Sequence, residues 1–211
     1  MNKVTAIFTL LHKAIPDPKI ELIYHSPFEL LIAVMLSAHT TDRSVNKATA
    51  QLFLLANSPQ KFLDLGITTL KKHIKGVGLY NTKAANIIKT CEILVAEHNS
   101  QVPNKREQLE KLPGVGRKTA NVVLNVAFGE PTIGIDTHAF RVANRTGLTN
   151  EKTPLAVEQK LLKIIPNKFK KIAHHLLVLH GRYVCKAKNP LCDKCVIKKY
   201  CDFFRQTNLN I

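Results

Sequence analysis

The sequence predicts an all-α fold, and three observations lead to that prediction. Apolar residues recur at helical spacing in several segments, capping residues precede many of these segments, and strand patterns are nearly absent. The chain has 211 residues, of which 45% are apolar, and this is enough to bury a large core without disulfides. The one strand candidate, Thr132–Ile135, is too short to build a sheet. We therefore expect about nine or ten helices.

Four capping patterns mark helix starts. Each combines a Ser, Thr or Asn, whose side chain can cap a helix, with a Pro at the first helical position or a Glu three residues later. They are Ser26 with Pro27 and Glu29, Ser58 with Pro59, Asn104 with Glu107, and Thr153 with Pro154. The first opens the apolar stretch 28–38, and Gly66 is expected to close the segment that the second opens. Apolar residues at helical spacing predict a further helix over 84–95.

Basic residues dominate the charge of the chain. Thirty-one Lys and Arg against 15 Asp and Glu give a net charge of +16 and a pI near 9.8. Such an excess favours polyanionic partners, either nucleic acid or an anionic membrane face. The longest apolar run, 30–36, is far shorter than the roughly 20 residues of a membrane span, and no signal peptide is recognisable. The composition therefore predicts an intracellular protein that binds nucleic acid.

A Leu-Pro-Gly-Val-Gly segment, 112–116, joins a helix expected to begin near Asn104 to a helix that begins at Arg117. Gly114 and Gly116 permit positive φ and leave backbone N–H groups exposed beside a helix N-terminus, which suits a phosphate oxygen. An ordinary interhelical turn is the alternative for an arbitrary G-x-G. In so basic a chain, a phosphate site that contacts the DNA backbone without reading its sequence is favoured.

Two residues are candidates for chemistry. Lys118 lies in the first turn of the helix after this loop, where the helix dipole and the neighbouring Arg117 disfavour a positive charge. An uncharged amine is a nucleophile that can form a Schiff base with a sugar aldehyde, although an exposed lysine that contacts phosphate fits the sequence equally well. Asp136 precedes an apolar-periodic helix, so its default role is an N-cap, which leaves its second oxygen available for catalysis.

Four of the five cysteines fall within a 17-residue window. They are Cys185, Cys192, Cys195 and Cys201, with the spacing C-x6-C-x2-C-x5-C. In an intracellular chain this clustering implies a closed metal site with four thiolate ligands, and coordination chemistry alone leaves zinc and an iron–sulfur cluster open. Lys186 and Lys188 lie in the same loop and could bind phosphates, although solvated charges are the usual alternative. Cys91 has the spacing of a helix-core residue.

Taken together, these motifs resemble those of the helix-hairpin-helix DNA glycosylases. The matching stretches are 26–34, 78–81, 112–121, 136–138, 180–183 and the four clustered cysteines, and they extend over nearly the whole chain. The resemblance implies two helical domains flanking a DNA-binding cleft. One is a six-helix domain over 21–130 that contains the helix-hairpin-helix motif (104–128), and the other combines 1–20 with 131–211 as an iron–sulfur domain.

The resemblance also implies roles for single residues. Lys118 matches the family's catalytic lysine, Asp136 matches its catalytic aspartate, and the four cysteines match the ligands of a [4Fe-4S] cluster. Leu79 corresponds to a residue that wedges into the duplex, whereas His39 stands where close members carry Gln, which leaves the opposite-base preference open. The expected DNA-binding residues are His39, Leu79, Gly114, Val115, Gly116, Lys186 and Lys188.

We therefore expect a bifunctional DNA glycosylase and abasic-site lyase that excises oxidised pyrimidines from damaged double-stranded DNA. The reaction would pass through a lysine Schiff base and β-elimination, in a monomer that works at the cytoplasmic nucleoid without a targeting segment. Adenine-mismatch glycosylases share the fold and the cysteine spacing but typically lack this lysine and carry a further C-terminal domain. A non-catalytic iron–sulfur DNA-structure binder or electron carrier would need neither Lys118 nor Asp136.

Overall fold

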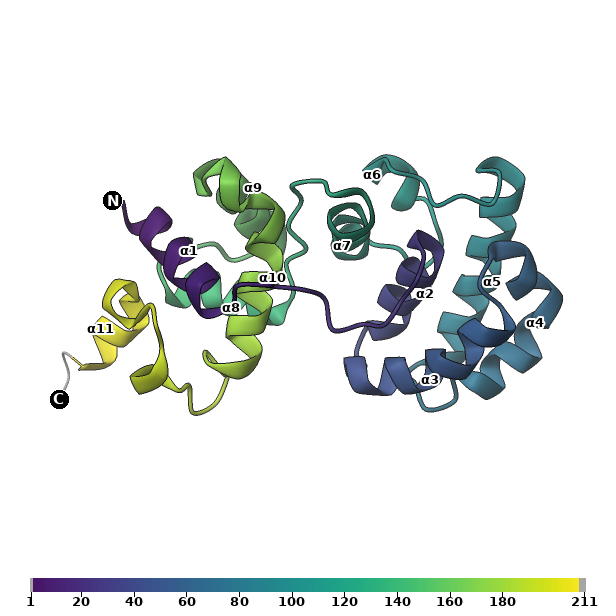
Figure 1. The fold of residues 1–211 in the computed structure, drawn as a ribbon, viewed down its shortest axis with the longest axis horizontal. Helices are drawn as coiled ribbons and strands as arrows, with labels where there is room; N and C mark the ends of the chain where they lie inside the picture. The colour runs from purple at the N-terminus through teal and green to yellow at the C-terminus, as the bar shows by residue number, and fades with distance from the viewer. Residues whose placement is uncertain (1, 209–211) are drawn as a thin grey trace. The chain divides into compact units, whose positions relative to one another are not determined.

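The computed structural model describes residues 2–208, and the regular elements of this part of the chain are all helices, as predicted (Figure 1). The helices are α1 (Lys3–Ala14), α2 (Pro27–Ser37), α3 (Asp42–Leu55), α4 (Pro59–His73), α5 (Tyr80–Glu97), α6 (Arg106–Leu109), α7 (Arg117–Phe128), α8 (Thr137–Arg145), α9 (Pro154–Ile164), α10 (Asn167–Tyr183) and α11 (Asp202–Asn208), with 3₁₀ turns η1 (Cys192–Lys194) and η2 (Lys198–Tyr200). Thr132–Ile135 is a buried connecting segment and forms no strand. No helix of residues 2–208 is long and apolar enough to cross a bilayer.

The chain folds into two compact units. Unit 2 comprises Glu21–Gly129 and holds α2 to α7. Unit 1 is formed by the chain up to Ile20 together with the chain from Glu130 onward, so it holds α1 and α8 to α11. The N-terminal helix therefore belongs to the same unit as the cysteine loop, and the side-chain amine of Lys3 binds the Asp202 carboxylate of α11 at 2.8 Å.

Three of the four predicted helix starts are confirmed by their caps. Ser26 accepts a hydrogen bond from the Glu29 amide at 3.1 Å, and Ser58 and Thr153 cap α4 and α9 in the same way. Each cap satisfies a backbone donor that the first turn leaves without a partner. Glu29 completes its capping box one residue earlier than expected, because its carboxylate accepts from the His25 amide at 2.7 Å.

The predicted helix start at Asn104 is wrong, whereas the predicted break at Gly66 is present. Asn104 does not cap a helix, because α6 begins at Arg106 after Lys105, which makes no side-chain cap. Tertiary contacts position α6 instead: Arg106 donates to the Asn121 side chain of α7 at 2.9 Å. Gly66 closes the helical segment that Ser58 opens, as predicted. Its backbone is not helical (φ +74°, ψ 158°), and a second helical segment follows this kink within α4 and continues to His73.

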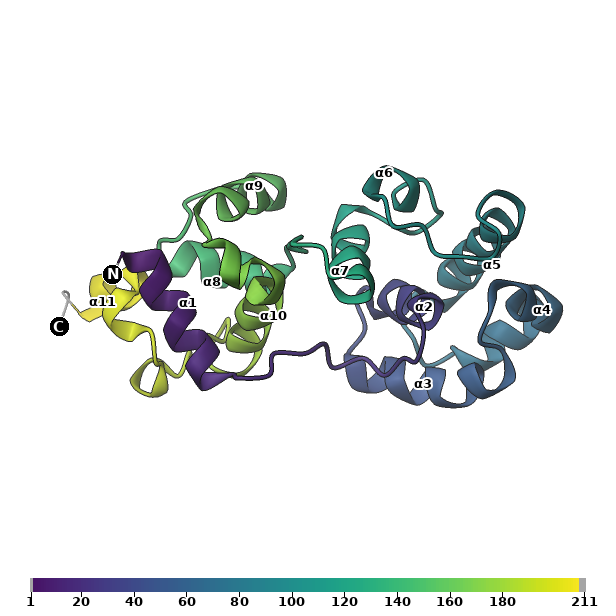
Figure 2. The ribbon, with the colours of Figure 1, turned by 45° about the horizontal axis from the view of Figure 1, so that its top comes forward.

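Unit 1 is built around one apolar core, to which α1, α8, α9 and α10 contribute (Figure 2). Core members include Phe8 of α1, Val142 of α8, Leu161 of α9 and Leu176 of α10, all fully buried. The rings of Phe8 and Phe169 stack with centroids 5.9 Å apart. This packing holds α8 against α10. It therefore fixes the position of Asp136 at the start of α8 and of the cysteine loop that follows α10.

Acid should destabilise unit 1 through His175. This α10 side chain is buried, its Nε2 has no hydrogen-bond partner, and burial lowers its pKa from the ordinary 6.5 to about 4. Between about pH 6.5 and pH 4 the unfolded chain therefore binds a proton that the folded chain excludes. We expect the free energy of unfolding to fall across this window by on the order of 3 kcal/mol, measured by urea denaturation at each pH.

The variant His175→Gln isolates this effect, because it removes the titrating group and leaves the rest of α10 unchanged. The difference in unfolding free energy between the wild type and the variant should shrink steadily as the pH falls from 6.5 to 4. A difference that stays constant over the whole window contradicts this role of His175.

Candidate nucleic-acid interface and cysteine centre

The hairpin turn between α6 and α7 lies against α5. Gly114 adopts φ +79°, and a Cβ built there would meet the Asn86 side-chain nitrogen at 2.9 Å. The Thr90 hydroxyl donates to the Pro113 carbonyl at 3.1 Å. Gly114 is therefore required both by its backbone conformation and by its close approach to α5.

Gly116 differs from Gly114, although both were expected to use the freedom of glycine. It caps α7 with ordinary extended backbone (φ −91°, ψ 177°), and a Cβ there would have no neighbour within 4 Å. Nothing in the protein itself requires glycine at this position. The open space lies beside the first N–H groups of α7, which lack partners within the helix, so it can admit an anion close to the backbone.

The structure separates the roles of Val115 and Lys118 in this hairpin. Val115 is buried, and its amide donates to the Leu112 carbonyl at 3.0 Å, so this residue closes the turn. Lys118 is the second residue of α7 and is exposed. Its amine can therefore reach a bound molecule in the same place where α7 offers its N-terminal backbone donors.

Asp136 is the N-cap of α8, as its default interpretation predicted. Its Oδ1 accepts a hydrogen bond from the Ala139 amide at 2.7 Å, and the residue is half-buried. One oxygen thus holds the helix, and the carboxylate keeps a second oxygen for another partner. Behind this cap Gly181 of α10 packs so tightly on α8 that a Cβ there would meet His138 Cβ at 2.8 Å.

Two exposed residues of unit 2, His39 and Leu79, adopt left-handed backbone conformations. Their φ values are +54° and +58°, and the Leu79 side chain is 66% exposed. Non-glycine residues in this region cost about 1 kcal/mol or more, and they persist only where the surroundings impose them. The two loops touch, because a Cβ on Gly78 would lie 3.4 Å from the His39 carbonyl. Sequence reasoning reached both residues only through the family resemblance.

The four clustered cysteines line one shared cavity in unit 1. None of the four forms a disulfide, and burial together with the neighbouring thiols raises the pKa of Cys195 to about 11 and also raises those of Cys192 and Cys201. A cationic group would remove this penalty by stabilising thiolates. Within residues 2–208 no three candidate ligands are arranged to hold a single metal ion. Four sulfurs around a shared cavity fit a cluster of several iron atoms.

Two arginines of α8, which the sequence analysis missed as part of the site, bind the start of the cysteine loop. Arg145 donates to the Lys186 and Ala187 carbonyls at 2.7 and 3.0 Å and lies 3.7 Å from the Cys185 sulfur. Arg141 donates to the Cys185 carbonyl at 2.9 Å. Their spacing of four residues, which puts them on one face of the helix that Asp136 caps, is the signal that could have identified them.

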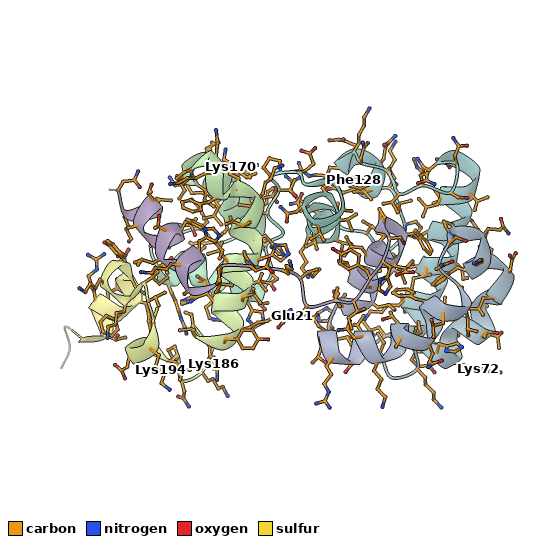
Figure 3. The ribbon with its side chains drawn as sticks, in the orientation of Figure 1. Glu21, Lys72, Phe128, Lys170, Lys186 and Lys194 are labelled. Atoms are coloured by element: carbon orange, nitrogen blue, oxygen red, sulfur yellow. The ribbon has the colours of Figure 1, made fainter. Side chains whose placement is uncertain are left out.

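The lysines of the cysteine loop face outward. Lys186 and Lys188 are both exposed, as expected for phosphate contacts or for solvated charges. Figure 3 shows Lys186 and Lys194 projecting away from the ribbon of this loop. Because the loop is held by Arg145 and by its cysteines, these charges are carried on a fixed backbone.

Fold and site together define a class of protein. An all-helical chain with a helix-hairpin-helix turn that presents a lysine, and with a four-cysteine loop, is an iron–sulfur DNA repair protein of the helix-hairpin-helix class. Comparison with known proteins agrees with this class. Residues 32–167 match the family model of the HhH-GPD superfamily of base excision DNA repair proteins, and residues 185–201 match the iron-sulfur binding domain of endonuclease III.

Relatives cover almost the full chain. Endonuclease III of Haemophilus influenzae is 58% identical, over 96% of this chain and 97% of its own length, and endonuclease III of Escherichia coli K12 is 55% identical, over 99% and 100%. A solved structure described as a trapped endonuclease III–DNA covalent intermediate superimposes with a TM-score of 0.92 at 43% identity, covering 99% of both chains. The chain belongs to the endonuclease III family of the HhH-GPD superfamily.

Membership has direct consequences. The protein is a base excision DNA glycosylase with abasic-site lyase activity, and it carries a [4Fe-4S] cluster. The interpretation as a non-catalytic iron–sulfur binder is therefore set aside. A thermostable thymine-DNA glycosylase superimposes with a TM-score of 0.85 but only 23% identity, so it shares the fold.

Proposed function

We propose that the enzyme is a bifunctional glycosylase and lyase that excises oxidised pyrimidines from damaged duplex DNA, acting as a monomer on the DNA of the cytoplasmic nucleoid. One observation carries the proposal: Lys118 presents an exposed amine in the first turn of α7, beside a glycine turn with open space in front of it. A covalent intermediate with DNA has been trapped for a similar protein of known structure, and this supports a covalent route here.

In this mechanism the Lys118 amine attacks C1′ of the damaged nucleotide. The C1′–N bond breaks, its electron pair leaves with the base, and the sugar ring opens to give an iminium on Lys118. Loss of a C2′ proton then breaks the C3′–O bond, so the strand is cut 3′ to the lesion by β-elimination. Hydrolysis of the iminium releases the sugar aldehyde and restores the amine.

Asp136 assists the same step from the start of α8. Its Oδ1 is committed to the Ala139 amide, so the second oxygen accepts the proton of the attacking amine or stabilises positive charge on the sugar. His39 and Leu79 enter the duplex where the damaged nucleotide leaves, a rearrangement that costs a few kcal/mol and less for a weakly stacked lesion. Gly114 and Gly116 admit a phosphate to the backbone of the hairpin.

The residues that would hold the cluster are Cys185, Cys192, Cys195 and Cys201. When bound, the cluster supplies rigidity to the loop and takes no part in bond cleavage. The loop then carries Lys186 and Lys188 as phosphate contacts on a fixed support.

Reduction with borohydride tests the proposal. The wild-type protein, mixed with a duplex that contains one thymine glycol and then reduced, should form a covalent protein–DNA adduct, and mass spectrometry should place the sugar on Lys118. The same duplex without the lesion is the control. Absence of an adduct, or an adduct at another residue, rejects the proposed chemistry.

Salt dependence measures the predicted phosphate contacts. If about five phosphates are neutralised, the logarithm of the affinity should fall with the logarithm of salt concentration at a slope of about −4 to −5. Changing Lys186 and Lys188 together to Ala should reduce that slope by about 2, equally on damaged and undamaged duplex. Fluorescence anisotropy over a salt series gives the slope, and a value near zero shows that the basic surface faces another partner.

A further inference from the structure

Lys83 is a buried charged residue that the mechanism does not use. We infer that Lys83 is a positioning residue, which holds the loop that carries His39 and the loop that carries Leu79 in one fixed register. The inference rests on the proposed insertion of these two side chains into DNA. It assigns the relative position of these two loops to one side chain of α5.

Lys83 connects the two loops through α5. Its backbone lies in the first turn of α5, where its amide makes the ordinary helical hydrogen bond to the Leu79 carbonyl at 3.0 Å and so places the side chain next to the Leu79 loop. Its side-chain Nζ crosses to the other loop and donates to the Leu36 carbonyl at 2.8 Å, the Ala38 carbonyl at 2.5 Å and the Thr40 hydroxyl at 3.2 Å. Three donors on one ammonium group thus meet three acceptors.

The acceptors of Lys83 surround His39 in the chain. Leu36 and Ala38 lie at the C-terminal end of α2, where carbonyls lack helical partners and where the helix dipole favours a cation. Thr40 follows His39 directly. The ammonium group therefore binds the loop on both sides of the left-handed residue, which limits the conformations that His39 can adopt.

The Lys83 side chain is buried, which sets it apart from Lys89, the exposed lysine of α5. Its side chain is only 7% exposed, and burial lowers its pKa, so the charge is kept by the bonds that it makes to the loop. A substitution that removes the donors would leave buried carbonyls without partners. The loop that carries His39 would then no longer be held in a single conformation. Lys89, on the same helix, is exposed, so its replacement removes an equal charge from the surface of α5.

Further along α5, the same helix supports the hairpin turn through Asn86 and Thr90. Lys83, Asn86 and Thr90 are spaced by three and four residues, so they lie on one face of the helix. The insertion loops and the phosphate turn of unit 2 are thus positioned by one rigid element. Lys83 controls the part of this arrangement that concerns insertion.

The variant Lys83→Met tests the inference, with Lys89→Met as the control for loss of one charge from α5. Excision of thymine glycol from duplex, measured in a single turnover, should slow by roughly 10- to 100-fold in Lys83→Met and remain unchanged in Lys89→Met. The fluorescence of 2-aminopurine opposite the lesion, which rises when that base is unstacked, should rise more slowly to the same extent. Borohydride trapping on an abasic site in a single strand needs no insertion and should proceed at the wild-type rate.

Equal losses on the duplex and on the single strand would overturn the inference, because they indicate general damage to the fold. Wild-type excision by Lys83→Met would also overturn it. If Lys83→Met does not fold, as judged by thermal denaturation, Thr40→Val removes one acceptor and should give a smaller loss of the same duplex-only kind. A wild-type protein that forms no adduct contradicts the proposed function, whereas normal wild-type trapping with an unaffected Lys83→Met contradicts only this inference.

Discussion

Replacing Lys118 with Gln is expected to abolish borohydride trapping and to lower the single-turnover rate of base excision by roughly four to six orders of magnitude, the range seen when a covalent nucleophile is removed. The amide of Gln cannot attack C1′ or form an iminium, so neither the glycosylase nor the lyase step can follow this route. Lys118 is exposed, so the fold should be unaffected. Rates are read from gel-separated cleavage products of a thymine glycol duplex.

Lys111→Gln is the matched control for the Lys118 variant. Lys111 is exposed and lies in the segment that leads into the same hairpin turn, so its change removes an equal charge. It should retain the wild-type excision rate and trapping. Affinity for a duplex with an uncleavable abasic analogue should stay within a few-fold of wild type in both variants, because phosphate contacts dominate binding. An adduct that persists in Lys118→Gln contradicts the assignment.

Replacing Asp136 with Asn is expected to slow turnover by about 10²- to 10⁴-fold, the range for a positioned acid–base group. DNA affinity and thermal stability should change little, because the Asn oxygen can still accept the hydrogen bond from the Ala139 amide, and Asn caps helices as well as Asp does. The experiment therefore separates the catalytic oxygen from the capping oxygen. Single-turnover kinetics, anisotropy and thermal denaturation provide the three readouts.

Two further variants control for capping in the Asp136 experiment. Asp136→Ala removes both functions and should lose about 1 kcal/mol of stability in addition to the same loss of turnover. Thr153→Ala removes the cap of α9, in the same unit, and should lose similar stability while it keeps the wild-type rate. If Asp136→Asn loses stability or DNA affinity, and this loss is large enough to explain its lower turnover, then Asp136 has only the capping role.

Local patterns predicted helix starts where the cap and its partner are neighbours in the chain. Ser26, Ser58 and Thr153 cap the amides three residues later, so the sequence contains both partners. The prediction at Asn104 failed because the position of α6 depends on Arg106 and on its partner in α7. Cys91 was placed correctly in the core: it is fully buried, and burial raises its pKa to about 12.

The same division holds for the candidate site. Lys118 and the glycine turn were found from sequence because an exposed amine at a helix start depends only on adjacent residues. The different roles of Gly114 and Gly116 were not predicted, since a G-x-G pattern does not show which glycine packs against Asn86. Val115 stays a predicted DNA contact, and the structure adds that it is buried and that its amide donates to the Leu112 carbonyl, so it also closes the turn.

By itself, the sequence determined the helical class, several helix starts and the set of four cysteines, because these depend on periodicity and spacing within one segment. Only the tertiary structure decided which distant groups meet. Lys83 binds carbonyls 45 and 47 positions earlier, and Arg145 binds the cysteine loop about 40 positions later. Such contacts are set by how helices pack, and helix packing depends on the whole core at once.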